Sequence, residues 1–319
     1  MWPTLGAMSK FDVVIVGGGA AGLAGALVLA RARRRVVVVD GGTPRNAPAA
    51  HMHGYLSRDG QSPQEFLEVG RDEVERYGVE FVHAHVTDIS QLAGVCGSEF
   101  WLATSDGATL RTRKVLVATG LSDVIPEIDG LRDRWGKDLL HCPYCHGYEV
   151  RDQALAVLGG SDESADHAVL LRQWSTDVVL LPHEDELTER SARRLAARIV
   201  RVIPGRIRRL IVDGDRLRAV ELDDGSEVPV TAAFVRPRFI PNDLLLSALD
   251  CEREDTAWVR TDTSGRTSVP GVFAAGNVVN PRAQVLTAAG EGSAAAIAMN
   301  ADLTEEDTRV ALAQPTTTP

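Results

Sequence analysis

The sequence is poor in cysteine, has no long hydrophobic run and carries no excess of basic residues. Four cysteines among 319 residues are too few for the disulfide scaffold of a small secreted domain. No apolar run approaches the length that crosses a membrane, so no membrane partner is expected. Acidic residues outnumber basic ones by 44 to 34, and the net charge of −10 argues against nucleic acid or an anionic membrane surface as partner. The N-terminal stretch MWPTLGAMSKFDVVIVGGG lacks the features of an export signal, so a cytoplasmic location is expected.

Hydrophobic periodicity indicates an α/β protein built from two similar parts. Residues 11–40 show a strand, a glycine turn, an alanine-rich helix and a second strand, which together make a βαβ unit. A second βαβ unit begins near Ala154. The other expected elements are a helix over 62–77, a strand over 79–86, antiparallel strands over 99–120, and DG turns at 213–214 and 224–225.

This pattern predicts two Rossmann-like three-layer domains, the first of them discontinuous. Its two parts are residues 1–126 and 242–319, and residues 127–241 form the domain that interrupts it. The acidic tail after Leu303 is expected to fray.

The glycine turn of the first βαβ unit has the residues of a dinucleotide site. Gly17, Gly19 and Gly22 satisfy G-x-G-x-x-G, which allows a tight turn, a close approach of a pyrophosphate and close packing of helix on strand. The pyrophosphate would then lie at the N-terminus of the helix, where amides and the helix dipole favour an anion. Asp40 lies 18 residues after Gly22, where an acid accepts hydrogen bonds from a ribose. Because strand, helix and acid agree, a dinucleotide site is favoured over a simple tight turn.

The stretch LHCPYCHGYE contains Cys142 and Cys145, two residues apart and followed by His146. C-x-x-C-H attaches haem in exported proteins, but no export signal is seen here. A structural zinc ion takes about four ligands, usually from two such pairs, whereas Cys96 and Cys251 are solitary. A redox-active pair is therefore favoured and no metal site is predicted. The two solitary cysteines are interpreted as structural.

A C-terminal segment indicates which dinucleotide the first domain binds. TSVPGVFAAGNVVNPRAQVLTAAGEGSAAA resembles the second FAD motif of the thioredoxin reductase family, and VLVATG at the domain crossover matches as well. The resemblance covers nearly the whole chain and implies a thioredoxin reductase-like fold with FAD in the discontinuous domain. It also implies that Gly276 and Asn277 reach the ribityl chain. The family's usual residue after the glycine is aspartate; asparagine keeps an acceptor but loses the charge, so FAD binding is expected to persist.

The cofactor contacts implied by this resemblance come from several segments. Gln284 and Val285 would face the flavin ring, and Asn46 lies in a loop that borders the cofactor in related flavoproteins. His51 and His53 share this loop, and a role for either at the substrate mouth is a hypothesis weighed against ordinary surface placement. The predicted contacts are Gly17, Gly19, Ala20, Ala21, Gly22, Asp40, Gly41, Arg45, Asn46, Val86, Thr119, Gly120, Gly276, Asn277, Gln284 and Val285.

The same resemblance assigns roles to the cysteine pair. Cys145 would lie against the flavin, and Cys142 would face incoming thiols. The family's acid after the second cysteine is replaced by His146, which can exchange protons near neutral pH and, as imidazolium, would stabilise the Cys145 thiolate. His141 could do the same for the outer sulfur or be an exposed bystander.

The second βαβ unit lacks the features of an NADPH site. Such a site needs another glycine turn and basic residues after the next strand. Gly159 and Gly160 are present, but Ser161 and Ser164 replace the later positions of the motif. Acidic residues stand at the helix start and where the family has H-R-R; they are Asp162, Glu163, Asp166, Glu184, Asp185 and Glu186. They would repel a phosphate, so NADPH is not expected to bind and the domain is interpreted as scaffold and dimer surface.

A flavin and a dithiol pair without NADPH most simply operate as an oxidase. The chain resembles the small-molecule dithiol oxidases of the gliotoxin and holomycin type, which combine C-x-x-C-H-G-Y-E with a defunct nicotinamide domain. This implies a homodimer that closes a disulfide in a small-molecule dithiol, with O2 as acceptor and H2O2 as product, in antibiotic synthesis or self-protection. Three alternatives stay open: a thioredoxin reductase-like enzyme with a donor such as ferredoxin, an NADPH-dependent reductase, and a flavin redox sensor without turnover.

Overall fold

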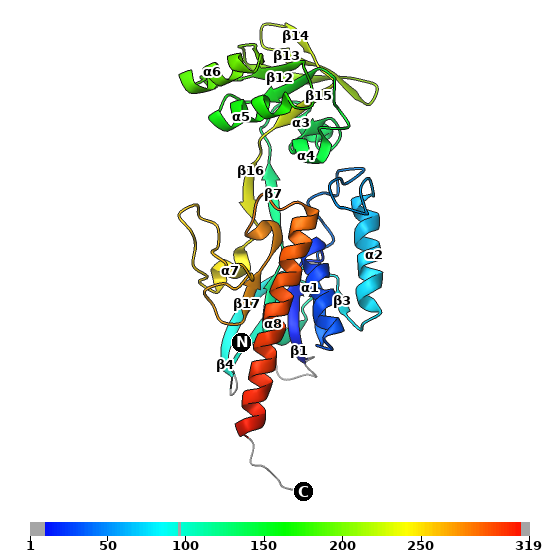
Figure 1. Cartoon of the computed structure of the whole chain (residues 1–319), viewed down its shortest axis with the longest axis vertical. Helices are drawn as coiled ribbons and strands as arrows, with labels where there is room; N and C mark the ends of the chain where they lie inside the picture. The colour runs from blue at the N-terminus through cyan, green and yellow to red at the C-terminus, as the bar shows by residue number, and fades with distance from the viewer. Residues whose placement is uncertain (1–9, 95–96, 314–319) are drawn as a thin grey trace. The chain divides into compact units, whose positions relative to one another are not determined.

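The computed structural model describes residues 10–94 and 97–313. Backbone contacts divide the chain into two compact units. The first unit comprises the described residues up to Arg45, residues Gln64–Ser122 and the chain from Ile240 onward; the second comprises Asn46–Pro63 and Asp123–Phe239. Two of the four passages between the units lie in β7 (Leu121–Val124) and β16 (Arg238–Pro241), which pair as a two-stranded sheet (Figure 1).

The first unit is built on a seven-stranded sheet in the order β3-β2-β1-β6-β5-β4, with β17 paired to β6. Strands β3, β2, β1, β6 and β17 are parallel, whereas β5 and β4 continue from β6 as an antiparallel meander. The strands are β1 (Lys10–Val16), β2 (Val36–Val39), β3 (Glu80–Val82), β4 (Val86–Gly94), β5 (Gly97–Thr104), β6 (Thr109–Val117) and β17 (Val272–Ala274).

Both faces of this parallel sheet are buried. Along β1, Val13 and Ile15 pack in one hydrophobic cluster and Val14 and Val16 in another, because successive side chains of a strand point to opposite faces. The helical elements of the unit are α1 (Ala20–Arg31), α2 (Pro63–Glu75), α7 (Leu244–Ala248), the 3-10 turn η1 (Gly276–Val278) and α8 (Val285–Ala313).

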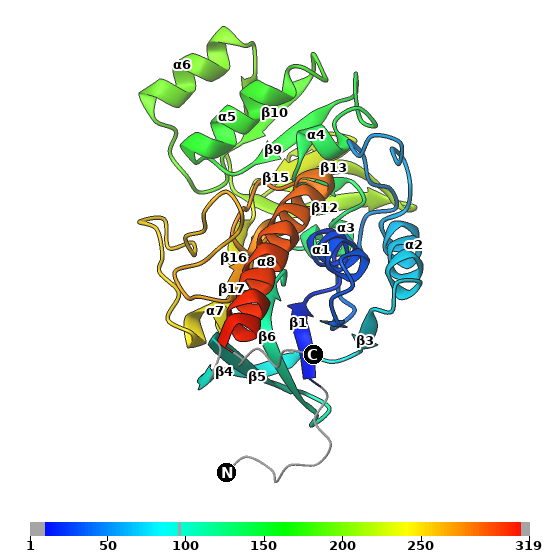
Figure 2. The same cartoon turned by 60° about the horizontal axis from the view of Figure 1, so that its bottom comes forward.

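Helices α1 and α8 lie side by side on one face of the sheet (Figures 1 and 2). Glycines allow their backbones to approach closely. A Cβ atom on Gly292 would overlap the carbonyl oxygen of Ala21, and one on Gly25 would lie 3.2 Å from the carbonyl oxygen of Gly292. The C-terminal helix is therefore seated on the helix that follows the glycine turn.

The second unit contains a five-stranded parallel sheet in the order β11-β10-β9-β15-β8 and a three-stranded antiparallel sheet, β12-β13-β14. Its strands are β8 (Leu139–Leu140), β9 (Leu155–Leu158), β10 (Val178–Leu181), β11 (Arg201–Val202), β12 (Ile207–Asp213), β13 (Arg216–Leu222), β14 (Glu227–Pro229) and β15 (Ala232–Val235). Its helices are α3 (Leu131–Arg134), α4 (Pro143–His146), α5 (Asp162–Leu171) and α6 (Glu189–Ala197). Two hydrophobic clusters cover the two faces of the parallel sheet.

The α/β fold with two Rossmann-like domains, predicted from the sequence, is confirmed. The DG turns at 213–214 and 224–225 connect antiparallel strands as expected. The expected antiparallel strands over 99–120 include β5 and β6, which a third DG turn, at 106–107, connects. The expected helix over 62–77 is α2, and the expected strand over 79–86 is interrupted, with β3 ending at Val82 and β4 beginning at Val86. Asn46–Pro63, which the sequence-based boundaries place in the first domain, groups with the second unit.

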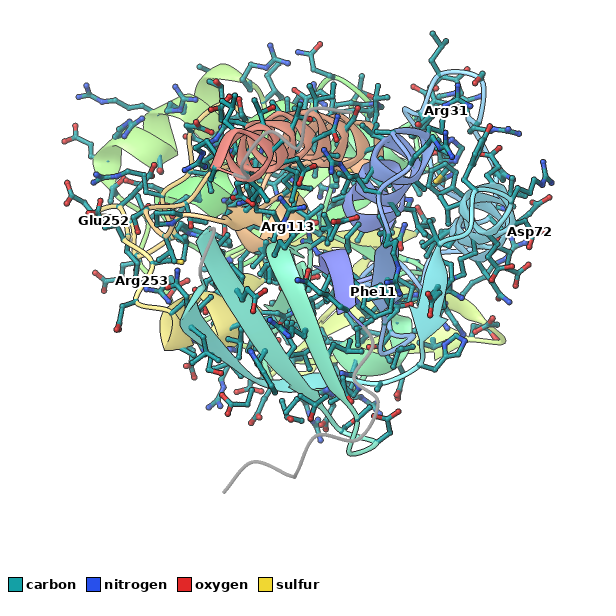
Figure 3. The ribbon with its side chains drawn as sticks, turned by 90° about the horizontal axis from the view of Figure 1, so that it is seen from below. Phe11, Arg31, Asp72, Arg113, Glu252 and Arg253 are labelled. Atoms are coloured by element: carbon teal, nitrogen blue, oxygen red, sulfur yellow. A yellow bond between two sulfur atoms is a disulfide. The ribbon has the colours of Figure 1, made fainter. Side chains whose placement is uncertain are left out.

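The expectation that the chain frays after Leu303 is wrong for residues 304–313, because α8 continues to Ala313; the rest of the tail lies outside the described residues. Glu306 is buried and forms an ion pair with buried Lys114 on β6. Arg113, labelled in Figure 3, lies 3.0 Å from Glu306 and 2.7 Å from Asp307. Glu306 and Asp307 thus pair with cations on β6, and these ion pairs hold the end of the helix on the sheet. No helix in the described part of the chain is long and apolar enough to cross a membrane.

Candidate active site

The glycine turn between β1 and α1 has the geometry of an anion cradle. Gly17 has a φ of +107°, and a Cβ atom there would overlap the carbonyl oxygen of Ala118. A Cβ atom on Gly22 would overlap the carbonyl oxygen of Gly17, so the first and third glycines are required by packing. Gly19, in contrast, faces open space, and the first turn of α1 contains no acid and no side-chain cap. The amides at this helix start, which include those of Ala20 and Ala21, are therefore placed to receive a phosphate.

Asp40 is held in a fixed position beside this turn. Its Oδ1 accepts a hydrogen bond from the backbone N–H of Gly18 at 3.0 Å, and its Oδ2 accepts one from Nη2 of Arg71 on α2 at 2.6 Å. The Nε of Arg71 is buried and has no hydrogen-bond partner among the described residues. An orphaned donor beside the ribose-type acid fits a polar ligand at this point. Arg71 was missed by the sequence interpretation, since no local motif connects it with Asp40, 31 residues away.

The C-terminal motif forms a closed network around Asn277. The Asn277 amide donates from Nδ2 to the carbonyl oxygens of Asn280 and Ala283, both at 2.9 Å, while its Oδ1 accepts from Nη1 of Arg45 at 3.2 Å. Glu291 on α8 accepts from the backbone N–H of Gly276 at 2.9 Å. The structure thus brings Arg45 to Asn277. The Asn277 side chain donates two hydrogen bonds to the loop before α8, which an aspartate carboxylate could not do.

Most of the remaining predicted cofactor contacts lie between β6 and β7, where the chain leaves the first unit, and at the starts of β4 and α8. The Thr119 hydroxyl donates to the carbonyl oxygen of Asn242 at 2.7 Å, and the Asn242 N–H donates to the carbonyl oxygen of Gly120 at 3.0 Å. Gly41 lies against the ring of His85, where no Cβ would fit. Val86 begins β4 and Val285 begins α8, and the carbonyl oxygen of the preceding Gln284 accepts from the Ala288 N–H.

Four of the predicted residues follow the ends of parallel strands in one sheet: Gly17 after β1, Asp40 after β2, Thr119 after β6 and Gly276 after β17. The carboxyl ends of parallel strands meet at one edge, where ligands of open α/β sheets bind. All predicted cofactor residues except Asn46 belong to the first unit. Its glycine cradle, uncapped helix start and orphaned arginine donor fit FAD.

The cysteine pair lies at the end of β8 in the second unit. Cys142 caps the one-turn helix α4, and its carbonyl oxygen accepts from the N–H groups of Cys145 and His146, each at 3.2 Å. This turn brings the two Cα atoms within 5.2 Å, and the sulfurs are joined in a disulfide. Both cysteines are half-buried, whereas Tyr144 and Tyr148 on the same segment are exposed. The pair is therefore close to a surface that small thiols can reach.

His146 has a depressed pKa, mainly because burial of the ring disfavours its charged form. The carboxylate of Glu149 opposes this shift, and the nearby His53 adds to it. The ring is thus held neutral in the disulfide state, and stabilisation of a Cys145 thiolate by His146 in the reduced pair stays a prediction. A neutral imidazole is suited to accept a proton from a thiol that approaches the disulfide.

The other histidines near this segment differ in their surroundings. The His141 Nδ1 lies 3.3 Å from the carbonyl oxygen of Val235, and its ring packs edge-on against Phe239. The His51 Nδ1 lies 3.0 Å from the carbonyl oxygen of Gly60. His53 lies between two carboxylates, those of Asp59 and Glu149.

Of the two solitary cysteines, the structure describes Cys251. Cys251 is buried beside Thr267, and burial raises the pKa of its thiol, as expected of an unreactive structural residue. Cys96 lies outside the described residues. Within residues 10–94 and 97–313, no group of histidine, cysteine and carboxylate side chains is arranged to hold a metal ion.

The glycine turn of the second unit is occupied by its own side chains. Ser161 caps α5 and accepts from the backbone N–H of Ser164 at 3.2 Å. The carboxylate of Asp162 accepts from the hydroxyls of Thr188 and Ser191, at 2.6 and 2.5 Å. Local hydrogen bonds lower the pKa of Glu163 as well, so the start of this helix carries two ionised acids.

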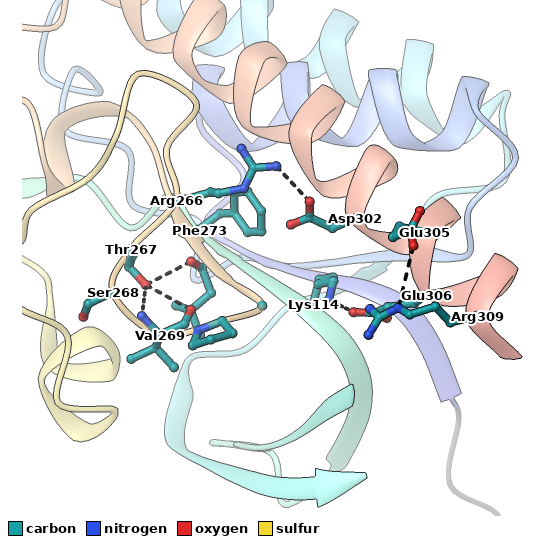
Figure 4. Close-up of a pocket in the computed structure, with 13 residues that line it drawn as sticks. Lys114, Arg266, Thr267, Ser268, Val269, Phe273, Asp302, Glu305, Glu306 and Arg309 are labelled. Carbon is teal, nitrogen blue, oxygen red and sulfur yellow. Dashed lines mark hydrogen bonds and ion pairs between the residues drawn. The ribbon is translucent and has the colours of Figure 1, made fainter. Parts of the chain in front are cut away.

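A separate hollow of about 400 Å³ lies in the first unit beside β17 and the end of α8 (Figure 4). Its charged lining is paired: Arg266 with Asp302 at 2.8 Å, Arg309 with Glu305 at 4.0 Å, and Lys114 with Glu306. The residues that line it include none of the predicted cofactor or cysteine residues. We assign it no part in the chemistry of the disulfide.

Three comparisons relate this geometry to known proteins. Residues 11–292 match the family model described as pyridine nucleotide-disulphide oxidoreductase. The crystal structure of HlmI is 56% identical and superposes with a TM-score of 0.94, covering 97% of this chain and 98% of that one. A putative thioredoxin reductase TrxB from Bacillus anthracis is 33% identical, with a TM-score of 0.88 over 93% of this chain and 99% of its own. The thioredoxin reductase sirT of Leptosphaeria maculans is 31% identical over 307 residues, which cover 92% of this chain and 94% of sirT.

Proposed function

The chain belongs to the pyridine nucleotide-disulphide oxidoreductase family, and from this premise we propose that it is an FAD-dependent dithiol oxidase. FAD is the cofactor of thioredoxin reductase-like members of this family. The substrate is a small-molecule dithiol, which leaves as an intramolecular disulfide, and O2 takes the electrons to give H2O2. The observation that carries the proposal is a disulfide, Cys142–Cys145, in a unit whose dinucleotide turn is occupied by its own acids and hydroxyls.

The proposed reaction starts with thiol–disulfide exchange at Cys142. A substrate thiol gives its proton to His146, and its sulfur bonds to the Cys142 Sγ. The Cys142–Cys145 bond breaks, and its electron pair stays on the Cys145 Sγ. The second substrate thiol then gives its proton to solvent and attacks the first substrate sulfur, so the cyclic disulfide forms and Cys142 leaves as a thiolate. The substrate has lost two electrons and two protons, and the cysteine pair has gained the two electrons.

Bound FAD would supply the acceptor that returns the cysteine pair to its disulfide. The residues proposed to hold it are the predicted contacts of the first unit, with Arg71 added. Asn46, which groups with the second unit, remains a proposed contact. We also propose a homodimer in the cytoplasm that acts in antibiotic synthesis or self-protection.

The proposal is tested by anaerobic bleaching of the flavin. NADPH is added to one sample, a small cyclisable dithiol to a second and reduced ferredoxin to a third, and each sample is then opened to air. We expect bleaching by the dithiol alone, with H2O2 formed as the colour returns. Bleaching by NADPH would establish a reductase and overturn the proposal. Bleaching by ferredoxin alone would favour the thioredoxin reductase-like alternative with a protein donor.

A further inference from the structure

The loop 46–63 packs in the same unit as the cysteine segment, although nearly 80 residues separate them. Its backbone closes on itself, since the N–H of Met52 donates to the carbonyl oxygen of Gln61 and the N–H of Gly60 donates to that of Met52, both at 2.9 Å. Met52 is buried. The residue that follows it, His53, is therefore carried on an anchored loop.

Each ring nitrogen of His53 faces a carboxylate. Its Nδ1 lies 3.4 Å from Oδ2 of Asp59, and its Nε2 lies 3.5 Å from Oε1 of Glu149. Asp59 is fixed by a hydrogen bond from the Gly54 N–H at 2.8 Å. A neutral imidazole can donate to only one of the two acids, whereas a protonated imidazole can donate to both. His53 therefore connects Asp59, on its own loop, with Glu149.

Glu149 connects this loop to the disulfide segment. It lies three residues after His146 and four after Cys145. The charged groups that act on His146 are Glu149, from its own segment, and His53, from the loop; the first favours the protonated ring and the second opposes it. Because His53 also contacts Glu149 directly, the two influences on His146 are coupled.

We propose that His53 and Glu149 are positioning residues for His146, forming with it a proton-handling cluster beside the Cys142–Cys145 disulfide. This inference rests on the proposed function. The proton that a substrate thiol loses when its sulfur bonds to Cys142 is accepted at His146, while the electron pair of the broken disulfide stays on Cys145. The proton then leaves His146 for solvent, which reaches the cluster at the partly exposed His53.

The test follows the His146 ring directly, in the oxidised protein loaded with FAD. Histidine is labelled with 13C, and the pH midpoint of the His146 resonance is recorded, with assignment by His146→Gln. Glu149→Gln removes the group that favours protonation, so we expect the midpoint to fall by about 0.5–1 pH unit. His53→Gln removes the group that opposes protonation, so we expect a rise of similar size. The pH of half-maximal turnover should move in the same two directions.

His51→Gln is the matched control, because His51 lies in the same loop and its Nδ1 contacts the Gly60 carbonyl oxygen rather than a carboxylate. We expect this variant to leave the His146 midpoint within about 0.2 unit of the wild type, a small fraction of the shift that a nearby charge produces. Asp59→Asn provides a second variant in case His53→Gln loses its fold. It should move the midpoint in the same direction as His53→Gln and by less.

Shifts of the same sign in Glu149→Gln and His53→Gln, or no shift in either with FAD retained, would overturn the inference. If the proposed oxidase activity itself is wrong, the anaerobic bleaching experiment would show it, because the dithiol would not bleach the flavin. The resonance midpoints do not depend on turnover. A dithiol that bleaches the flavin normally, combined with unmoved midpoints, would thus refute the cluster alone.

Discussion

The carboxylate of Asp185 accepts a hydrogen bond from the backbone N–H of Gly160 at 2.9 Å. Asp40 makes the same contact with Gly18 in the first unit at 3.0 Å. Asp185 is therefore the counterpart of a ribose-type acid, which accepts a 2′-hydroxyl and repels a 2′-phosphate. The two units differ in the helix that follows the glycine turn, because α1 begins without an acid whereas α5 begins with Asp162 and Glu163.

From this difference we predict that NADPH neither binds nor reduces the flavin. Glu184→Arg combined with Asp185→Arg should not create NADPH oxidation, because Asp162 and Glu163 still oppose the pyrophosphate at the helix start. The measurement is anaerobic flavin absorbance during titration with NADPH, with dithionite as the positive control. Stoichiometric bleaching of the unmodified protein by NADPH would contradict this account of the second unit.

The cysteine pair allows the inner and outer thiols to be told apart. Cys142→Ser and Cys145→Ser should each retain FAD, since the pair belongs to the second unit, and each should abolish dithiol turnover. With a chromogenic aromatic disulfide, the thiol left in Cys145→Ser should react faster than the thiol left in Cys142→Ser. The double variant supplies the background from the other cysteines. Normal turnover by Cys142→Ser would remove its assignment as the outer thiol.

The features that sequence could predict are local ones. The glycine turns, the two βαβ units and the DG turns depend on residues a few positions apart, and Asp40 lies at the usual spacing from its glycines. The C-x-x-C spacing likewise contains most of the disulfide geometry, because one helical turn brings Cys142 and Cys145 together.

The contacts that sequence did not reveal are distant, or depend on burial. Arg71 reaches Asp40 from another helix, and His53 reaches Glu149 across 96 positions, with no periodic pattern to report either contact. The charge state of His146 depends on how deeply its ring is buried, which the motif alone does not specify. The acidic tail was expected to lie in solvent because the cations that pair with it, Arg113 and Lys114, lie about 190 positions earlier in the sequence, on β6.

Asn277 should not tolerate aspartate without loss of stability. A carboxylate at this position has no N–H for the carbonyl oxygens of Asn280 and Ala283, so two acceptors lose their donor. We expect Asn277→Asp to lower the free energy of unfolding by about 1–3 kcal/mol. Asn300→Asp is the control, because Asn300 accepts from Arg34 and a carboxylate keeps that contact. Equal urea midpoints for the two variants would show that the amide donors contribute nothing.

His167 should make the stability of the protein depend on pH in a defined window. It is buried, neither ring nitrogen has a hydrogen-bond partner among the described residues, and burial, aided by His141 and Arg236, lowers its pKa to about 3. In the unfolded chain the ring takes up a proton near pH 6.5, whereas the folded chain resists it down to about pH 3. The unfolding free energy should therefore fall as pH falls below about 6.5, by up to about 1.4 kcal/mol per pH unit.

His167→Leu should remove this contribution without leaving a polar group unsatisfied. We expect the variant to be at least as stable as the wild type at pH 7 and to lose less stability by pH 5. Urea unfolding at the two pH values gives the comparison, and other titrating groups cancel in the difference. Identical losses in the two proteins would show that His167 gains a proton, or a partner, in the folded state.

The ion pair between Lys114 and Glu306 should show strong coupling, because both partners are buried. Glu306→Leu leaves Lys114 without its acid and Arg113 with one acid fewer, so we expect a loss of about 3–5 kcal/mol. Lys114→Met should cost less, since Glu306 keeps Arg113 at 3.0 Å. The double variant, which buries neither charge, should recover much of the loss. Additive losses in this double-mutant cycle would mean that Lys114 and Glu306 do not stabilise each other.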